Sequence, residues 1–206
     1  MEVAQAIEQR RSAKVFDPAH RLTEAEVDRL MSLAMLAPTA FNIQHWRFVI
    51  VDDPQLRQAL RRVSKDQAQV TEASLLVVLC GDLKAWSRDT ARYWRTAPAD
   101  VQPVLVSLIE QYYAGRAQTE RDEVMRSCGI AAMALMLAAR EMGYESCPMD
   151  LSDLDAVGNL LNLPDDHVVS MFVAIGKGIK EPWPRGGQLP MAEVVIRNRF
   201  PDHSVA

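Results

Sequence analysis

Apolar residues recur at two different spacings along the chain, and these spacings predict a protein of mixed helix and strand. From Thr23 to Met35 they lie three and four positions apart, which is typical of an amphipathic helix. Thr23 followed by Glu26 is a capping-box pattern, so the helix should begin there, and Pro38 should end it. Similar patterns predict further helices over residues 4–9, 104–116, 121–142 and 152–161.

Short apolar runs bounded by turn residues predict a small sheet. They cover residues 46–51, 75–80 and 168–175, and Gly81 should stop the second of them. The chain then becomes rich in proline and glycine and ends with a strand-like run, Val194–Ile196. Because the strands are few and long helices separate them, the pattern predicts one α+β domain, residues 1–206, with helices flanking a minor sheet.

The helix over residues 121–142 is apolar on all sides in its middle, so either it is central to the domain or a partner subunit covers its outer face. Its apolar run, Cys128–Ala139, is shorter than the roughly 20 residues of a membrane span. Met1–Gln5 lacks the pattern of a signal peptide. We therefore expect no association with membranes.

Composition narrows the class of protein further. The chain has 206 residues, a formal net charge of −4 and 3 cysteines without a CxxC pair. The pI of about 5.6 argues against a nucleic-acid partner, since such proteins usually carry a basic face. The cysteine pattern favours a reducing, cytoplasmic location.

Common catalytic and cofactor motifs are missing from the sequence. There is no GxGxxG or GxxxxGK[ST] loop and no GxSxG elbow. The 4 histidines are scattered and none has metal-ligand spacing, so we expect no metal site. These absences argue against Rossmann and P-loop enzymes and most hydrolases.

Three segments remain as candidates for a binding site. Arg10–Lys14 places three cations and a hydroxyl at a helix end, where they could bind a phosphate or simply complement the helix dipole. Asn42 and Gln44, two apart in what should be an extended loop, could hold a polar ligand or form a turn. Pro148 could present the amides of the next two residues outward, or the segment could be a plain connection.

Together these segments resemble the FMN-dependent nitroreductase family. The resemblance rests on RRSAK from Arg10, APTAFNIQHWRF from Ala37, GYESCPM from Gly143 and GKGIKEPWPRGGQLP from Gly176. It implies an α+β sandwich with a small, mostly antiparallel sheet. It also implies an intertwined homodimer with FMN at the subunit interface, in which an arm of about residues 177–206 wraps the partner and exchanges a C-terminal strand.

The resemblance also implies roles for individual residues. Arg10, Arg11 and Ser12 resemble the phosphate and ribityl contacts, Arg185 resembles a phosphate contact in the tail, and Lys14 resembles the cation near the flavin pyrimidine. The loop that the partner subunit lays against the flavin corresponds to Pro38, Thr39, Ala40, Asn42 and Gln44. Gln67 and Gln69 correspond to amides near the pyrimidine edge. Pro148, Met149 and Asp150 correspond to the backbone segment at the flavin N5 and O4.

Three positions depart from the commonest family pattern. His45 replaces a proline, Thr39–Ala40 replaces small serines, and Gln188 stands where a second basic residue is common. The last change removes one charge-assisted contact, worth roughly 1.5–3 kcal/mol unless it is replaced. Arg10, Arg11 and Arg185 could still bracket a phosphate.

The implied activity is reduction of nitroaromatic or quinone acceptors, which are small and planar, by NAD(P)H in a ping-pong scheme through flavin N5. Two alternatives stay open. One is an FMN reductase of a specific aldehyde, enone or halogenated substrate, and the other is a flavin-binding protein without turnover. Residues 86–94 should cover the pocket or form a surface element, whereas Cys147 and His45 fit structural roles.

Overall fold

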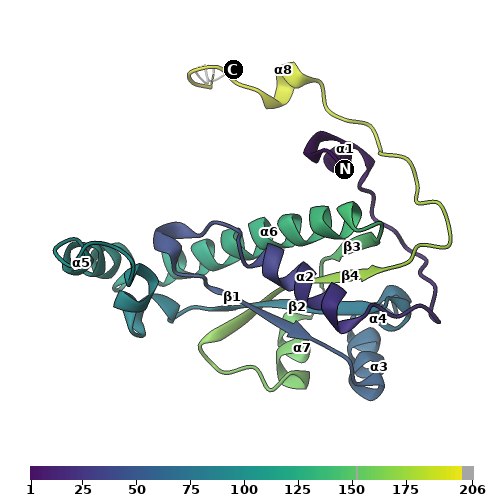
Figure 1. Cartoon of the computed structure of the whole chain (residues 1–206), viewed down its shortest axis with the longest axis horizontal. Coiled ribbons are helices and arrows are strands. Elements are labelled where there is room, and N and C mark those ends of the chain that lie inside the picture. Colours follow the sequence, from purple (N-terminus) through teal and green to yellow (C-terminus); the bar gives the residue numbers. More distant parts are fainter. Residues whose placement is uncertain (152, 201–206) are drawn as a thin grey trace, which may run out of the picture.

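The computed structural model of the chain describes residues 1–151 and 153–200. Its centre is a four-stranded antiparallel sheet in the order β1-β2-β4-β3 (Figure 1). The strands are β1 (Trp46–Ile50), β2 (Leu75–Asp82), β3 (Glu145–Met149) and β4 (His167–Gly176). The outer strands β1 and β3 each leave one edge of the sheet unpaired by another strand of the sheet.

Helices pack on both faces of this sheet (Figure 1). Side chains alternate along β2, so Leu75, Val77 and Leu79 join the core formed with α2 and α6. Leu76 and Val78 point the other way, into the core formed with α3 and α7. These helices are α2 (Glu24–Ala34), α6 (Ala117–Glu141), α3 (Pro54–Val63) and α7 (Leu154–Leu160). The predicted sandwich with a minor sheet is confirmed.

Shorter elements complete the chain. The remaining α-helices are α1 (Val3–Gln9), α4 (Gln69–Glu72), α5 (Gln102–Tyr113) and the single turn α8 (Met191–Val194). The 3-10 turns are η1 (Ala40–Asn42), η2 (Ala85–Ser87) and η3 (Thr90–Trp94). No helix in the described part of the chain has the length and apolar character needed to span a bilayer.

The predicted capping box is confirmed at α2. The Thr23 side chain accepts a hydrogen bond from the Glu26 backbone N–H, and the Glu26 carboxylate accepts one from the Thr23 backbone N–H at 2.8 Å. The helix already ends at Ala34, before Pro38. The helix predicted over residues 152–161 is present as α7 with Asp153 as its N-cap, while Ser152 lies outside the described residues.

One prediction about the strands is wrong. Gly81 does not stop β2, because it pairs with Trp46 on one side and Val168 on the other. Glycine is needed there, since an added Cβ would lie 2.0 Å from Val124 Cγ1 on α6. At the other end of the chain, Val194–Ile196 forms no strand within the single chain, where Val194 belongs to α8, so its exchange with a partner subunit stays a prediction. A strand requires a neighbouring edge for its hydrogen bonds, and within this single chain the run lies away from the sheet (Figure 1).

Residues 177–200, which we call the arm, leave β4 and run past α1 (Figure 1). Its large apolar side chains are exposed, including Leu189, Met191, Val194 and Phe200. The beginning of the arm is tied to the body of the protein, where Gly178 forms an antiparallel bridge with Phe16, and Arg185 further along donates to the Ile7 carbonyl.

Candidate functional site

The predicted cationic segment directly follows α1 and extends the sheet at its β3 edge. Arg10 is the C-cap of α1. Ser12 then forms a parallel bridge with Ser146 of β3, and the Ala13 N–H donates to the Ser146 carbonyl at 3.0 Å. This pairing fixes the backbone of Arg10–Lys14 against a rigid strand, so the side chains on either side of Ala13 are presented at the edge of the sheet.

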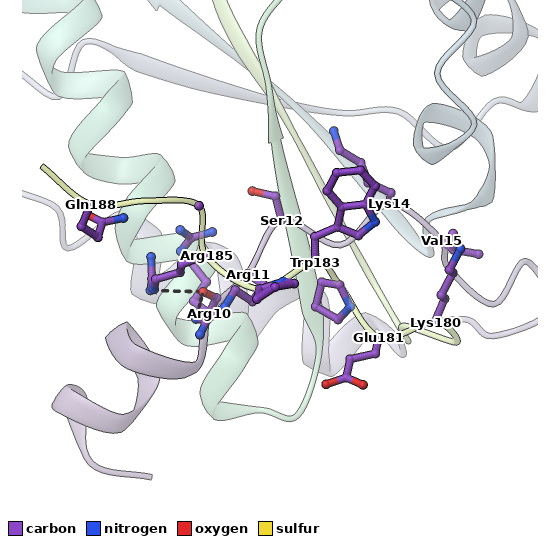
Figure 2. A pocket seen from close by; sticks show the side chains of 13 residues that line it. Arg10, Arg11, Ser12, Lys14, Val15, Lys180, Glu181, Trp183, Arg185 and Gln188 are labelled. Atoms are coloured by element: carbon purple, nitrogen blue, oxygen red, sulfur yellow. Dashed lines mark hydrogen bonds between the residues drawn. The ribbon is translucent and has the colours of Figure 1, made fainter.

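A cavity of about 530 Å³, which we call the first cavity, lies between this segment and the arm (Figure 2). Its volume falls within the range of small-molecule sites. It brings together six of the predicted site residues: Arg10, Arg11, Ser12, Lys14, Arg185 and Gln188. The sequence reasoning missed the other lining residues, which are Val15, Lys180, Glu181, Pro182, Trp183, Pro184 and Gly186.

Most of the missed residues belong to the proline-marked tail, within the motif GKGIKEPWPRGGQLP that begins at Gly176. That motif gave Arg185 and Gln188, but nothing in the local pattern shows that the whole stretch 180–188 folds back over Arg10–Lys14. The pairing of Gly178 with Phe16 and the hydrogen bonds from Arg185 to the Ile7 and Arg10 carbonyls bring the arm there.

Arg10 carries the clearest sign of a missing ligand. Its Nε and Nη1 atoms are buried and have no hydrogen-bond partner. Burial, with the nearby charges of Arg185 and Arg11, lowers the pKa of Arg10 from its ordinary value. Buried donors without a partner are costly, so this guanidinium is suited to an anion that enters the cavity.

The other two arginines donate to backbone carbonyls. Arg11 Nη1 donates to the Glu8 carbonyl at 2.5 Å, which agrees with a cation complementing the end of α1. Arg185 Nη2 donates to the carbonyls of Ile7 at 2.6 Å and Arg10 at 3.3 Å. Within the described residues none of these arginines forms an ion pair with a carboxylate. Helix capping therefore accounts for Arg11 and Arg185, but it leaves the two buried nitrogens of Arg10 without a partner.

Gln67 and Gln69 lie near the same edge of the sheet without lining the first cavity. Gln69 is buried, and its Nε2 lies 3.3 Å from Gln67 Oε1 and 3.9 Å from Cys147 Sγ. Cys147 is fully buried in β3 next to Ser146, as expected for a structural thiol.

Pro148 and Met149 belong to the edge strand β3 and Asp150 directly follows it, so the segment is not an outward turn. The Ser146 carbonyl points outward to Ala13, so alternation along β3 directs Pro148 and Asp150 outward as well and turns Met149 toward β4. The prediction of an outward Met149 amide is therefore wrong, while an outward Asp150 agrees with the strand geometry. Pro148 suits this position, because its missing N–H would otherwise face the open edge.

The predicted loop around Asn42 is compact, so the expectation of an extended conformation is wrong. Phe41, Asn42 and Gln44 have φ of 52°, 56° and 54°, a left-handed conformation that non-glycine residues rarely adopt. Thr39 Oγ1 accepts from the Gln44 N–H at 2.9 Å, and Gln44 Nε2 donates to the Asn42 carbonyl at 3.2 Å. The side-chain amides of Asn42 and Gln44 do lie close together, because the left-handed backbone conformation of this turn brings the two residues side by side.

Within one chain this loop lies far from the first cavity. Phe41 and Ile43 pack against Tyr113 of α5, and α5 lies at the end of the molecule away from the arm (Figure 1). Gln44 lines a second cavity of about 510 Å³ beside β1, together with Arg47 and Tyr93. The structure thus leaves Pro38, Thr39, Ala40, Asn42 and Gln44 out of the first cavity.

The segment 86–94 lies at the surface with its aromatic side chains half-buried. Trp86 stacks on Tyr113 with ring centroids 5.7 Å apart, and the Asn42 side chain donates to the Tyr93 carbonyl at 3.1 Å. His45 is fully buried and its Nε2 lies 3.2 Å from the Tyr113 hydroxyl, which confirms a packing and hydrogen-bonding role. Burial lowers the pKa of His45.

One cluster of potential metal ligands occurs among the described residues: Asp82, Asp166 and His167. Arg47 and Arg88 both form ion pairs with the buried Asp82, at 2.9 and 2.6 Å. Two guanidinium groups already supply the positive charge that a cation would bring. The cluster is therefore an ion-pair network, and it ties β1 to the segment after β2.

The profile of the Nitroreductase family matches residues 7–177, most of the chain. The chain belongs to the nitroreductase family. Protein DrgA of Synechocystis sp. is 52% identical over 177 residues, which cover 86% of this chain and 84% of DrgA. MhqN of Bacillus subtilis, which bears the name of an NAD(P)H nitroreductase, is 32% identical over 201 residues, or 94% of this chain and 98% of MhqN.

A solved member of the same fold agrees with this assignment. The structure of an Exiguobacterium sibiricum protein in complex with FMN has a TM-score of 0.86 and 27% identity, and covers 95% of this chain and 97% of that one. The family match ends at residue 177, where the arm begins. The match to MhqN and the likeness to the Exiguobacterium structure extend over 94% and 95% of this chain.

Proposed function

We propose that this nitroreductase-family protein binds FMN and uses NAD(P)H to reduce nitroaromatic or quinone-type acceptors. The observation that carries the proposal is the half-buried Arg10 side chain, with two buried, unpartnered nitrogens next to two further arginines and no carboxylate partner in the described structure. A phosphate dianion would accept hydrogen bonds from those nitrogens and relieve the repulsion between the cations. FMN carries such a phosphate together with its redox-active ring.

The residues of the first cavity divide into two groups in Figure 2. Arg10, Arg11 and Arg185 gather on one side and would hold the phosphate, while Lys14 extends on the other side toward the ring. Ser12 lies between these groups and would contact the ribityl chain. Gln67, Gln69 and Pro148–Asp150 adjoin the same sheet edge, where the pyrimidine end would be bound.

When bound, FMN accepts a hydride from NAD(P)H and passes reducing equivalents to an acceptor that takes the same place. The protein needs only to orient the cofactor and stabilise charge. Lys14 is exposed and makes no ion pair within the described residues, so its charge is available to favour negative charge at the pyrimidine end.

We further propose that the protein is a homodimer whose partner completes each site. The loop 38–44 is strained, rich in polar groups and remote from the first cavity of its own chain, so a second subunit would be needed to bring it there. The open β1 edge beside the second cavity could accept the apolar arm of the partner, which would form the predicted exchanged strand at Val194–Ile196.

Spectroscopy of the purified protein tests the proposal. We expect a yellow protein with flavin absorbance that bleaches on anaerobic addition of NADPH or NADH and recovers when menadione or a nitrofuran is added. Flavin absorbance without bleaching would instead support a flavin-binding protein without turnover. Bleaching without turnover of nitro compounds or quinones would favour an enone, aldehyde or halogenated substrate. A protein that takes up no FMN would refute the proposal.

A further inference from the structure

Trp183 is the most exposed large apolar side chain in the described part of the protein, at 86% of its full accessibility. It nevertheless lines the first cavity, alongside Lys14 and Ser12 (Figure 2). An indole exposed to this extent leaves most of its apolar surface in water, which burial against a flat apolar surface would remove. The side chain is therefore available to a ligand that enters the cavity.

The stretch of arm that carries Trp183 is anchored at both ends. Before it, the Ile179 N–H donates to the Val15 carbonyl at 3.3 Å, and Gly178 bridges Phe16. After it, Arg185 donates to the carbonyls of Ile7 and Arg10. We call residues 178–185 the strap. Its two anchors hold it across the cationic segment, so Trp183 is kept at the cavity.

Two prolines restrict the strap between these anchors. Pro182 and Pro184 flank Trp183, and each fixes its own φ near −65°. A residue that precedes proline is also biased toward an extended backbone, which applies here to Glu181 and to Trp183. Trp183 thus loses little backbone freedom when a ligand covers its indole, which favours binding.

The first cavity has two chemically different sides (Figure 2). Arg10, Arg11 and Arg185 lie together on one side, and Trp183 with Lys14 lies on the other. A ligand that matches both must be anionic at one end and planar and aromatic at the other. FMN has this combination.

On this basis, and resting on the proposed FMN function, we propose that Trp183 is a binding residue of the cofactor site and packs against the planar ring of FMN. The strap then acts as a wall of the site supplied by the same chain that supplies the arginines. A nitroreductase partner surface could also cover an exposed indole, and the experiment below separates these two occupants.

The test titrates FMN into the full-length apoprotein and measures two quantities, the dissociation constant and the emission of the bound flavin. We expect Trp183→Ala to raise the Kd about 3- to 10-fold, and Trp183→Phe to stay within about 2-fold of the wild type, because an aromatic contact is retained. An indole in contact with flavin quenches its fluorescence, so flavin bound to Trp183→Ala should emit more strongly. Val104→Ala is the control, since Val104 is an exposed apolar residue on α5 and lies outside both the cavity and the arm.

The outcomes are distinguishable. Wild-type protein that binds no FMN would refute the proposed function itself. Wild-type protein that binds FMN, with unchanged Kd and unchanged flavin emission in Trp183→Ala, would refute only the role of Trp183. A shift of Trp183→Ala toward monomer in light scattering, with unchanged emission of the bound flavin, would assign the indole to the subunit interface and would likewise refute it, whether or not the Kd rises.

Discussion

The charges of single residues in the first cavity affect both the stability of the empty protein and its affinity for a ligand. Arg10, Arg11 and Arg185 repel one another, and burial adds to the cost of the charge on Arg10. Such a group destabilises the empty protein slightly and becomes favourable only when an anion is present. Residues of this kind are expected where a site is built for binding rather than for stability.

Arg10→Met should therefore have opposite effects on folding and on binding. We expect the free energy of unfolding of the apoprotein to stay the same or rise, because repulsion with Arg185 and Arg11 is relieved. The Kd for FMN should rise about 10- to 100-fold, since a charge-assisted hydrogen bond contributes about 1.5–3 kcal/mol. Urea unfolding and FMN titration measure the two quantities. Arg62→Met, at an exposed position on α3, should change neither, and equal effects of the two substitutions would contradict the assignment.

Lys14→Met separates electrostatic stabilisation from cofactor binding. If the Lys14 charge favours negative charge on the flavin ring, stopped-flow absorbance should show flavin reduction slowed more strongly than FMN binding is weakened. Lys14→Arg keeps the charge and should retain most of the rate. An unchanged rate in Lys14→Met would remove this role.

One hydrogen bond between α2 and the segment before β3 depends on pH at both extremes. The Tyr144 hydroxyl donates to Glu26 Oε1 at 2.5 Å, and together with the hydrogen bonds from Thr23 it lowers the pKa of Glu26 from 4.5 to about 2. A lowered carboxyl pKa contributes stability above its unfolded value, and that stability is lost as pH falls from 4.5 toward 2. The same contact raises the pKa of Tyr144 from 10 to about 12, so its contribution is lost as pH rises through that interval.

Tyr144→Phe should flatten the pH dependence of unfolding at both ends. Relative to the wild type, its deficit in stability should be present near pH 7 and should shrink below pH 4 and above pH 11. Urea unfolding across this range measures the deficit, and an NMR titration of the Glu26 carboxyl should show its pKa moving back toward the ordinary value. A deficit independent of pH would show that only packing of the ring had been altered.

At the scale of elements, contact between β2 and α6 depends on one glycine. Gly81 continues β2 under α6, where the buried Val124 side chain occupies the space of a Cβ. The capping box of α2 is specified by adjacent residues, whereas this contact joins residues far apart in the chain. Neighbouring residues therefore define each helix or strand, but how closely two elements pack depends on the side chains that both contribute to the contact.

Gly81→Ala should force β2 and α6 apart and lower the free energy of unfolding by about 1–3 kcal/mol. Gly129→Ala is the matched control on α6, because an added Cβ there meets no atom within 4 Å. Removing a glycine from a helix interior should raise the stability by up to about 1 kcal/mol. Urea unfolding of the apoproteins gives both values. A loss of similar size in both variants would contradict the steric explanation.

At the scale of the whole molecule, the proposed site is divided between the two ends of one chain. The cationic segment and strap lie at one end, and the strained loop 38–44 lies near α5 at the other (Figure 1). Ile130 and Met133 lie three positions apart on α6 and remain 40% and 38% exposed, as a subunit interface on this helix would require.

Ile130→Glu places a charge on this exposed apolar position of α6. We expect light scattering to show a shift from dimer to monomer, and the monomer to bind FMN more weakly because the partner's loop 38–44 is lost. Arg121→Glu changes the charge at an exposed position of the same helix and should leave both properties unchanged. A variant that remains dimeric would move the interface elsewhere, and a monomeric wild type would contradict the dimer.

The sequence alone determined those features that depend on neighbours along the chain. The capping box at Thr23, the apolar strands and the clustering of charge at Arg10–Lys14 all follow from residues a few positions apart. The resemblance to nitroreductases added the candidate site residues, and the first cavity contains six of them. Local interactions are encoded by spacing, so spacing was sufficient to find these features.

How distant segments meet depends on the packing of the whole chain. Ser12 pairs with Ser146, and Arg185 bonds to the carbonyl of Ile7, which lies 178 positions away. The conformation of the loop at Phe41–Gln44, the inward turn of Met149 and the presence of Trp183 in the cavity all depend on such distant pairings. No local pattern encodes them, because they result from packing the whole chain around one sheet.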